Sequence, residues 1–341
     1  MVVLSPAARD DRFGRLAEPE PSVWVLHDGK PGMASQVRGL AEAAGFAFIE
    51  KQLSIRRPWT WLAPQLWVAP LSAATQAGAP LVPPWPDLVI GCGRNTAAPA
   101  LAIRRASGGR TLAAQIQDPH IGRGEFDMLF VPEHDRLRGP RVIVTRGALH
   151  RVTPQLLAAE RRRFPALEAL PRPILGVLIG GSNRTYRLGL RRLGEIAGLI
   201  AGIVRQCGGS AVVTPSRRTG EAGVAVLRER LAGLPGAVWD GTGENPYFAY
   251  LAIADALLVT ADSVSMVSEA AATGKPVHIL GLDGGDAKFA RFHASMREAG
   301  ITRPFRGHIE SWSYAPPDAA ARAGAVLREL LLSRLAQRSR V

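Results

Sequence analysis

The chain has 341 residues, of which 47% are hydrophobic and 21% charged, so it can bury a large interior and is longer than one core usually organises. Its apolar stretches are interrupted by Arg, Pro or Gly well before the ~20 residues that a membrane-spanning helix needs. The two cysteines, Cys92 and Cys207, provide neither a disulfide framework nor a cysteine zinc site, and they fit a reducing cytoplasm.

The net charge is +13, and nearly all of the 42 basic residues are arginines. Because a guanidinium matches phosphate with two parallel donors, this composition favours anionic partners such as phosphates or acidic lipids. A GC-rich genome, which encodes arginine where another encodes lysine, explains it equally well. Aromatic residues make up only 6% of the chain and no basic stripe is interleaved with Phe or Tyr, which argues against a nucleic-acid partner.

In chain order, residues 1–21 mix charged residues with proline and lack an apolar signal core, so we expect a flexible leader. From residue 22, short β-rich runs alternate with helical patterns, as in parallel sheets with crossover helices. The pattern predicts strands at 23–26, 46–52, 87–90, 110–116, 128–131 and 142–144, and helices at 33–44, 95–106 and 154–164. Three prolines within 165–173 disfavour a helix interior or a central strand, and we interpret this stretch as an interdomain linker.

The second half of the chain repeats this order. It predicts strands at 174–179, 211–214, 237–239, 256–260 and 277–280, and helices at 188–206, 220–232, 247–254, 263–272 and 287–298. Apolar residues at helical spacing predict a long helix within 316–341, which we expect to pack back on the N-terminal domain. The sequence therefore predicts an α/β fold with two Rossmann-like domains, 22–164 and 174–315, that face a cleft.

A glycine-rich turn follows the strand that opens the second half, and its residues are candidates for holding a phosphate: Gly180, Gly181, Ser182, Asn183 and Arg184. Open parallel sheets bind ligands at the carboxyl ends of their strands, and glycines let backbone N–H groups approach a phosphate. Ser182 adds a hydroxyl donor and Arg184 a positive charge. The alternative is a tight turn that needs only a positive φ.

A second candidate lies where the strand at 256–260 enters the next helix. Asp262 or Ser263 caps that helix, and the N–H groups behind the cap, near Ser265, form an anion site. Glu269 follows about two turns later, where its carboxylate can accept both hydroxyl hydrogens of a ribose. Its alternative role is that of a surface glutamate stabilising the helix start.

The run 254–277 resembles the donor half of B-fold glycosyltransferases, such as the N-acetylglucosaminyl transferase of peptidoglycan synthesis. The resemblance implies that Glu269 binds the ribose, that Gly180, Gly181 and Ser182 form the diphosphate loop, and that Ser263 starts the helix beside the phosphates.

The chain also resembles, more specifically, the mitochondrial-fission family named for elongated mitochondria in plants, whose bacterial members are usually described as glycosyltransferases. The matching stretches are 27–32 with Gln36, 117–119, 180–183, 244–247 and 260–269. Plant members are associated with recruiting a dynamin-like protein to the mitochondrial surface. The resemblance therefore implies the fold more firmly than the activity.

Three loops of the first half hold candidate bases and anion contacts. An inverting sugar transfer needs a base near the acceptor hydroxyl, and His27 or Asp28 can serve, with the other orienting it. The alternative there is a Gly-Pro turn whose Asp caps the next helix. Asp118 or His120 is a further candidate base, although Asp before Pro also starts turns. In the loop after the third strand, Arg94 is a candidate anion contact.

Two further segments have a functional and a structural interpretation. Arg56 and Arg57 stand beside three tryptophans in 56–67, a composition suited either to a lipid headgroup layer or to ordinary helix packing. Cys92 has no activating partner in the sequence and is interpreted as a small packed residue. The residues that we expect near the pocket for the nucleobase are Trp239, Asn245 and Tyr247.

The leading hypothesis is a transferase that moves a sugar from a nucleoside-diphosphate sugar to an acceptor, with the donor in the C-terminal half and a lipid-linked or cell-envelope acceptor in the N-terminal half. No Asp-x-Asp pair occurs, so we expect neither a metal nor another cofactor. Two alternatives stay open: a non-catalytic scaffold on an anionic membrane, and a nucleotide-sugar epimerase or hydrolase. We expect a cytoplasmic protein, with peripheral contact at the inner face of a membrane.

Overall fold

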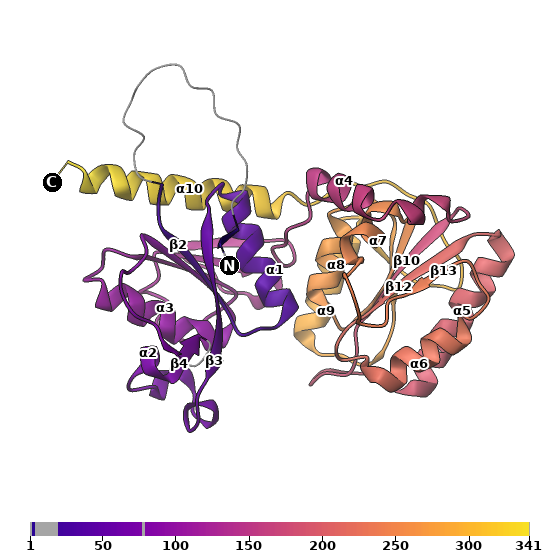
Figure 1. Ribbon diagram of the computed structural model, residues 1–341, viewed down its shortest axis with the longest axis horizontal. Helices are drawn as coiled ribbons and strands as arrows, with labels where there is room; N and C mark the ends of the chain where they lie inside the picture. Colours follow the sequence, from indigo (N-terminus) through magenta and orange to yellow (C-terminus); the bar gives the residue numbers. More distant parts are fainter. Residues whose placement is uncertain (1, 4–19, 77–78, 341) are drawn as a thin grey trace, which may run out of the picture. The chain divides into compact units, whose positions relative to one another are not determined.

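The computed structural model describes residues 2–3, 20–76 and 79–340, which pack into two α/β units (Figure 1). The first unit comprises residues 1–145, 149–151 and 319–341, and the second comprises 146–148 and 152–318. The leader expected at 1–21 lies outside the described residues, except for 2–3 and 20–21. Within the described part, no helix has the length and apolar character needed to cross a bilayer.

The first unit is built on a sheet of nine described strands in the order β5-β4-β3-β2-β6-β7-β8-β9, with β1 beside β3. The strands from β3 to β9 in this order are parallel, whereas β4, β5 and β1 are antiparallel additions. The strand bounds are β1 Val2–Val3, β2 Val23–His27, β3 Phe48–Ile55, β4 Ala74–Gln76, β5 Ala79–Pro80, β6 Leu88–Cys92, β7 Leu112–Ile116, β8 Met128–Pro132 and β9 Val142–Thr145. The described helices of this unit are α1 Pro31–Ala43, α2 Pro70–Ala73, α3 Arg94–Ala106 and α10 Ala319–Arg338.

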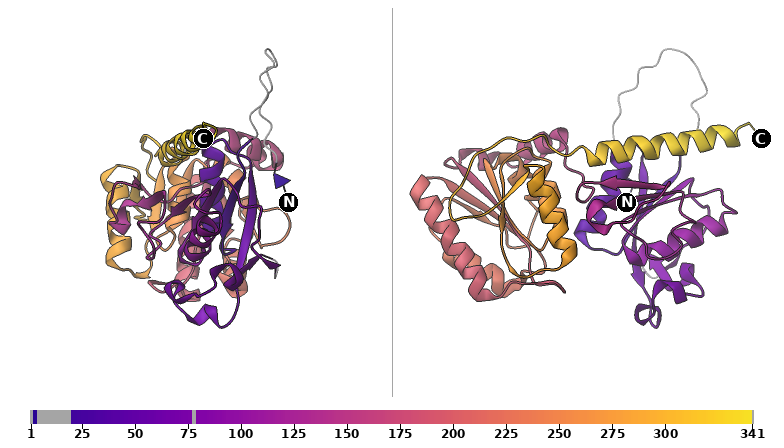
Figure 2. Two further views of the ribbon diagram at one scale, coloured as in Figure 1. Left: turned by 90° about the vertical axis from the view of Figure 1, so that its left-hand side faces the viewer. Right: turned by 180° about the vertical axis from the view of Figure 1, so that it is seen from behind.

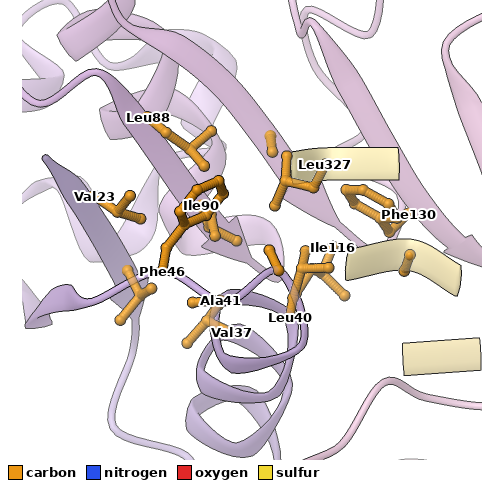
Figure 3. Packing of buried hydrophobic residues seen from close by; sticks show 14 of the residues in the cluster. Val23, Val37, Leu40, Ala41, Phe46, Leu88, Ile90, Ile116, Phe130 and Leu327 are labelled. Carbon is orange, nitrogen blue, oxygen red and sulfur yellow. The ribbon is translucent and has the colours of Figure 1, made fainter. Parts of the chain in front are cut away.

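Alternate residues of the central strands bury opposite faces of this sheet. On one face, Val23 and Ile90 pack with Leu40 of α1 and Leu327 of α10 (Figure 3). On the other, Trp24 and its same-face neighbours pack against α3. Helix α10 packs against α1 and lies across one end of it in Figure 1, and Figure 2 shows the same helix from two other sides. Short 3-10 turns lie at Trp59–Trp61, Pro64–Leu66 and Glu133–Asp135.

The second unit has six parallel strands in the order β13-β12-β10-β14-β15-β17. Their bounds are β10 Ile174–Ile179, β12 Ser210–Pro215, β13 Gly236–Val238, β14 Ala256–Thr260, β15 Val277–Leu280 and β17 Thr302–Pro304. A separate ribbon pairs β11 Tyr186–Arg187 with β16 Asp283–Gly284. Its described helices are α4 Pro154–Arg163, α5 Leu190–Cys207, α6 Gly220–Arg230, α7 Tyr247–Ile253, α8 Val264–Ala271 and α9 Ala287–Glu298, with a 3-10 turn at Pro165–Ala169. Helices α5 and α6 pack on one face of the sheet and α7, α8 and α9 on the other.

The two Rossmann-like units confirm the predicted fold class, and each predicted strand and helix has a counterpart within a few residues. The β4–β5 hairpin, the β11–β16 ribbon and β17 are short elements that the hydrophobic pattern did not predict. The unit boundary also differs from the predicted linker, because α4 packs against α7 and residues 165–173 lie inside the second unit, where Pro165 opens a 3-10 turn.

Candidate functional site

Three loops of the second unit meet at the carboxyl edge of its sheet. Strands β12, β10 and β14 are neighbours, and each is followed by a loop with polar residues. Gly180 and Gly181 follow β10, Arg218 lies in the loop after β12, and Asp262 lies in the loop after β14. The order of the strands therefore brings together residues that are far apart in the sequence.

The two glycines are needed because their neighbours approach so closely. A Cβ on Gly180 would lie 2.2 Å from both carboxylate oxygens of Asp262, and one on Gly181 would lie 2.5 Å from the backbone carbonyl carbon of Arg218. Neither glycine has a positive φ. Close packing, and not a left-handed turn, therefore explains glycine at both positions, which corrects the simple-turn alternative.

The N–H groups of this loop already donate to side chains of the β14 end. Gly180 N donates to Thr260 Oγ1 at 2.8 Å, and Gly181 N donates to Asp262 Oδ2 at 3.0 Å. The Arg218 guanidinium pairs with the same Asp262 oxygen, and the Asp262 carboxylate is wholly shielded from solvent. The loop thus holds a protein carboxylate at the amide that the sequence assigned to a phosphate.

The remaining loop residues mainly fix the turn. Asn183 Oδ1 accepts hydrogen bonds from the backbone N–H groups of Thr185 and Tyr186 at 2.8 Å, and its Nδ2 donates to the Asp262 carbonyl. Ser182 Oγ accepts from the backbone N–H of residue 188 at 2.9 Å, while Arg184 is exposed. Asn183 and Ser182 therefore support the loop from within.

Helix α8 begins at a capped N-terminus. Ser263, not Asp262, is the cap, because its side chain accepts from the Met266 N–H at 3.3 Å. The N–H groups of Val264 and Ser265 belong to the first turn, where no intrahelical acceptor exists. The start of α8 therefore keeps donors for an anion, in addition to Arg218.

Glu269 lies deep in the unit, with 6% of its surface exposed, so it is not the surface glutamate of the alternative interpretation. Tyr247, the first residue of α7, donates its hydroxyl to Glu269 Oε2 at 2.6 Å. Burial, and then the Glu269 charge, raises the pKa of Tyr247 well above its usual value, so the phenol stays a donor. Asn245 positions Tyr247 by accepting its backbone N–H at 3.0 Å, whereas Trp239 donates its indole N–H to a carbonyl of its own loop.

His27, at the end of β2, uses both ring nitrogens inside the first unit. The Gly29 N–H donates to Nδ1 at 3.0 Å, so Nε2 carries the proton and donates to Glu50 Oε1 at 2.5 Å. Arg38 also donates two hydrogen bonds to Glu50. Burial raises the pKa of the Glu50 carboxyl, but the bonds from Arg38 and His27 outweigh it, and the pKa lies below its usual value.

Two of the other predicted bases, Asp28 and Asp118, have different surroundings. Asp28 pairs with the exposed ammonium of Lys30 and accepts from Asn95 Nδ2 at 3.3 Å. Asp118 accepts two hydrogen bonds from Arg123, at 2.9 and 2.6 Å, and one from the His120 N–H. Burial raises the pKa of Asp118, but these hydrogen bonds outweigh that effect and the pKa lies below its usual value, so the carboxylate is a weak base.

Two further side chains named from the sequence, Cys92 and Arg94, stand at the end of β6 and the start of α3. The Cys92 thiol is buried against the Met33 sulfur, and burial raises its pKa, so it is a packed residue and not a nucleophile. Arg94 starts α3 with its side chain exposed. Arg218 was not among the residues predicted from the sequence. Its loop follows a predicted strand, as the other two loops do, and this position could have marked it as a candidate.

Comparison with known proteins identifies the relatives of this chain. Residues 31–331 match the family described as Mitochondrial fission ELM1. The chain belongs to this family. A mitochondrial fission protein of Arabidopsis thaliana is 35% identical over 277 residues, which cover 73% of this chain and 65% of the plant protein. The chain thus matches slightly less than two thirds of that relative's length.

A second relative is an uncharacterized protein of Rickettsia prowazekii (strain Madrid E), 24% identical over 359 residues, 90% of this chain and 98% of that protein. Among solved structures, the UDP-GlcNAc 2-epimerase of Methanocaldococcus jannaschii matches with a TM-score of 0.55 and 11% identity, over 92% of this chain and 99% of that chain. Its complex with UDP-GlcNAc and UDP matches with a TM-score of 0.52 and 12% identity, over the same shares. The fold is therefore that of enzymes with two Rossmann-like domains.

Proposed function

We propose that this protein binds a nucleoside-diphosphate sugar in its second unit and transfers the sugar to an acceptor bound by its first unit. The observation that carries the proposal is the convergence of the Gly180-Gly181 loop, Arg218 and the start of α8 on one edge of a parallel sheet, with the shielded Glu269 carboxylate on the same helix. The epimerase of the same fold was solved with UDP-GlcNAc, which supports a nucleotide sugar as ligand.

The spacing along α8 suits a nucleotide. Glu269 follows the Ser263 cap by six residues, about 9 Å along the helix axis. A ribose that is hydrogen-bonded to Glu269 would thus place the attached diphosphate near the helix start, where Val264 and Ser265 offer N–H groups. Arg218, with the exposed Arg184, supplies positive charge for the departing diphosphate.

The transfer itself needs one base. The acceptor oxygen forms a bond to the anomeric carbon, the bond from that carbon to the diphosphate oxygen breaks, and its electron pair leaves with the diphosphate. The acceptor proton passes to a carboxylate, for which we assign Asp28, whose partner Lys30 has an exposed ammonium. Asp118 is less suited because its bonds to Arg123 and the His120 N–H lower its pKa, and both His27 nitrogens are engaged. His27 positions the loop that bears Asp28.

Calorimetric titration with UDP, GDP, ADP and CDP tests the donor site. Wild type is expected to bind one of them with micromolar affinity, and Glu269→Ala and Gly181→Val are expected to lose that binding while keeping a cooperative thermal transition. Glu229→Ala, an exposed glutamate of α6, is the matched control and should bind as wild type does. Folded wild type that binds none of the four contradicts the proposal.

The fold match to epimerases favours a second activity, epimerisation or hydrolysis of the same nucleotide sugar. Such an enzyme needs no second sugar, so incubation of wild type with the donor alone separates the two hypotheses. Turnover of the donor without acceptor, followed by NMR, would favour the epimerase or hydrolase.

One exposed segment of the first unit favours peripheral membrane contact, with or without catalysis. Trp61, Leu66 and Val68 are 74%, 60% and 90% exposed, and the Arg57 guanidinium lies 5.7 Å from the Trp61 ring centre. Trp67, in contrast, is buried and donates its indole N–H to the carbonyl of residue 59. Exposed apolar side chains beside arginines suit anionic headgroups.

Vesicle sedimentation tests this contact. Trp61→Ser combined with Leu66→Ser should abolish binding to vesicles containing phosphatidylserine, whereas Leu332→Ser, an exposed leucine of α10, should not. Equal binding by all three proteins would contradict a role of this segment. Vesicle binding by a folded protein that binds no nucleotide would favour the scaffold.

A further inference from the structure

Asp262 places a negative charge where the glycine loop and the α8 start would hold a phosphate. Its side chain is fully shielded from solvent, and only Oδ2 has partners, Gly181 N–H and Arg218. Its other oxygen, Oδ1, is buried without a hydrogen-bond partner among the described residues. The carboxylate is therefore incompletely compensated in a shielded position.

The charge of Asp262 faces the loop directly. A Cβ on Gly180 would lie 2.2 Å from both carboxylate oxygens, so no atom separates the carboxylate from the loop backbone. Burial, and then the charges of Asp286 and Asp262, raises the pKa of the nearby Tyr186 phenol, as expected of a group beside a negative electrostatic field. An anion that enters this loop meets that field.

The counter-charge is partly exposed to solvent. Arg218 comes from the loop after β12, and 44% of its side chain is exposed. A phosphate bound at the loop would also pair with the Arg218 guanidinium, which would weaken or break the ion pair between Arg218 and Asp262. Each further negative charge on the ligand then adds repulsion from a carboxylate that has lost part of its compensation.

The two forms of a donor differ in charge. A nucleoside-diphosphate sugar carries two negative charges, whereas the free diphosphate gains a third when its terminal phosphate ionises with a pKa of about 6. We propose that Asp262 is a specificity-determining residue that makes the site favour the sugar-bearing diphosphate over the free diphosphate, and so promotes product release. This inference rests on the proposed nucleotide-sugar site in the second unit.

The test measures binding of UDP-GlcNAc, UDP and uridine, or the matching ligands of whichever base the nucleotide titration selects. Wild type is expected to bind UDP-GlcNAc at least as tightly as UDP. In Asp262→Asn, and in the smaller Asp262→Ser, UDP binding should tighten by about tenfold or more, UDP-GlcNAc binding should tighten less, and uridine binding should stay unchanged. Thr260→Val, which removes the acceptor of Gly180 N–H without changing charge, is the control and should leave the UDP to UDP-GlcNAc ratio unaltered.

The outcomes separate the two proposals. If all three ligands weaken together in the Asp262 variants, or if wild type binds UDP more than tenfold more tightly than UDP-GlcNAc, the inference is overturned while the nucleotide site stands. If neither wild type nor the folded variants bind any nucleotide or nucleotide sugar, both the inference and the proposed function are overturned.

Discussion

Lys275 offers a direct test of how the C-terminal end of α7 is held in the second unit. Its ammonium donates to the carbonyls of Leu251 and Ala252, at 2.7 and 2.6 Å, which are the C-terminal acceptors of α7. The pKa of Lys275 is lowered from 10.5 to about 8: burial is the largest cause, Asp255 opposes it, and the charges of Arg161 and Arg172 add to it. Replacement by methionine removes the titrating group and keeps most of the aliphatic volume.

The direction in which pH changes the free energy of unfolding follows from the number of protons that the folded and unfolded chains bind. Between about pH 8 and 10.5, the unfolded chain holds a proton on Lys275 that the folded chain has released, so the free energy of unfolding rises with pH across this window. The full shift corresponds to about 3 kcal/mol, and partial exposure of the side chain reduces the expected gain to roughly 1–3 kcal/mol. Lys275→Met shows no such gain.

Urea unfolding of both proteins at pH 7, 8, 9 and 10 measures the effect. Groups that titrate alike in the two proteins, such as tyrosines, cancel in the difference between their unfolding free energies. We expect this difference to shift in favour of wild type by roughly 1–3 kcal/mol between pH 7 and 10. A difference that stays constant, or that shifts in favour of Lys275→Met, would refute the reasoning.

Three further predictions concern the two units. Gly202→Ala, at an exposed position of α5 where an added Cβ meets no atom within 4 Å, should stabilise the protein by ~0.5–1 kcal/mol in urea unfolding. Glu269→Gln should weaken binding of the selected nucleoside diphosphate by roughly 10–100-fold in calorimetry, whereas Tyr247→Phe, which keeps the carboxylate, should change it by less than about threefold. Glu50→Gln should destabilise the protein by about 1 kcal/mol at pH 7, and that difference should shrink in urea unfolding as the pH falls below 4.5, because the folded pKa of Glu50 is lowered.

The polar residues of the second unit show which parts of the candidate site can be predicted from the sequence. Gly180, Gly181, Ser263 and Glu269 follow predicted strands or lie on a predicted helix, and parallel strands must end at one edge of their sheet. This rule was enough to expect them together. It did not show that Asp262 turns its carboxylate onto the Gly181 amide, because a side-chain hydrogen bond across two loops depends on their final conformation.

In the first unit, too, the strands could be predicted from the sequence but the side-chain pairs between them could not. Its strands were predicted from short β-rich runs, and the candidates His27 and Asp28 from their place after the first predicted strand. Besides local contacts, each has a partner far along the chain: His27 meets Glu50 of β3, 23 residues away, and Asp28 meets Asn95, 67 residues away. No local pattern encodes such pairs, since they arise only when the sheet sets β2 beside β3 and β6.

The sequence by itself determined the alternation of strands and helices, the two Rossmann-like domains and the position of the glycine loop, because each depends on hydrophobic period or on residues close in the chain. The tertiary structure decided which unit α4 joins, which arginine reaches the glycine loop and which carboxylate is shielded. These depend on packing between distant segments: α4 on α7, Arg218 on Asp262, and Tyr247 on Glu269.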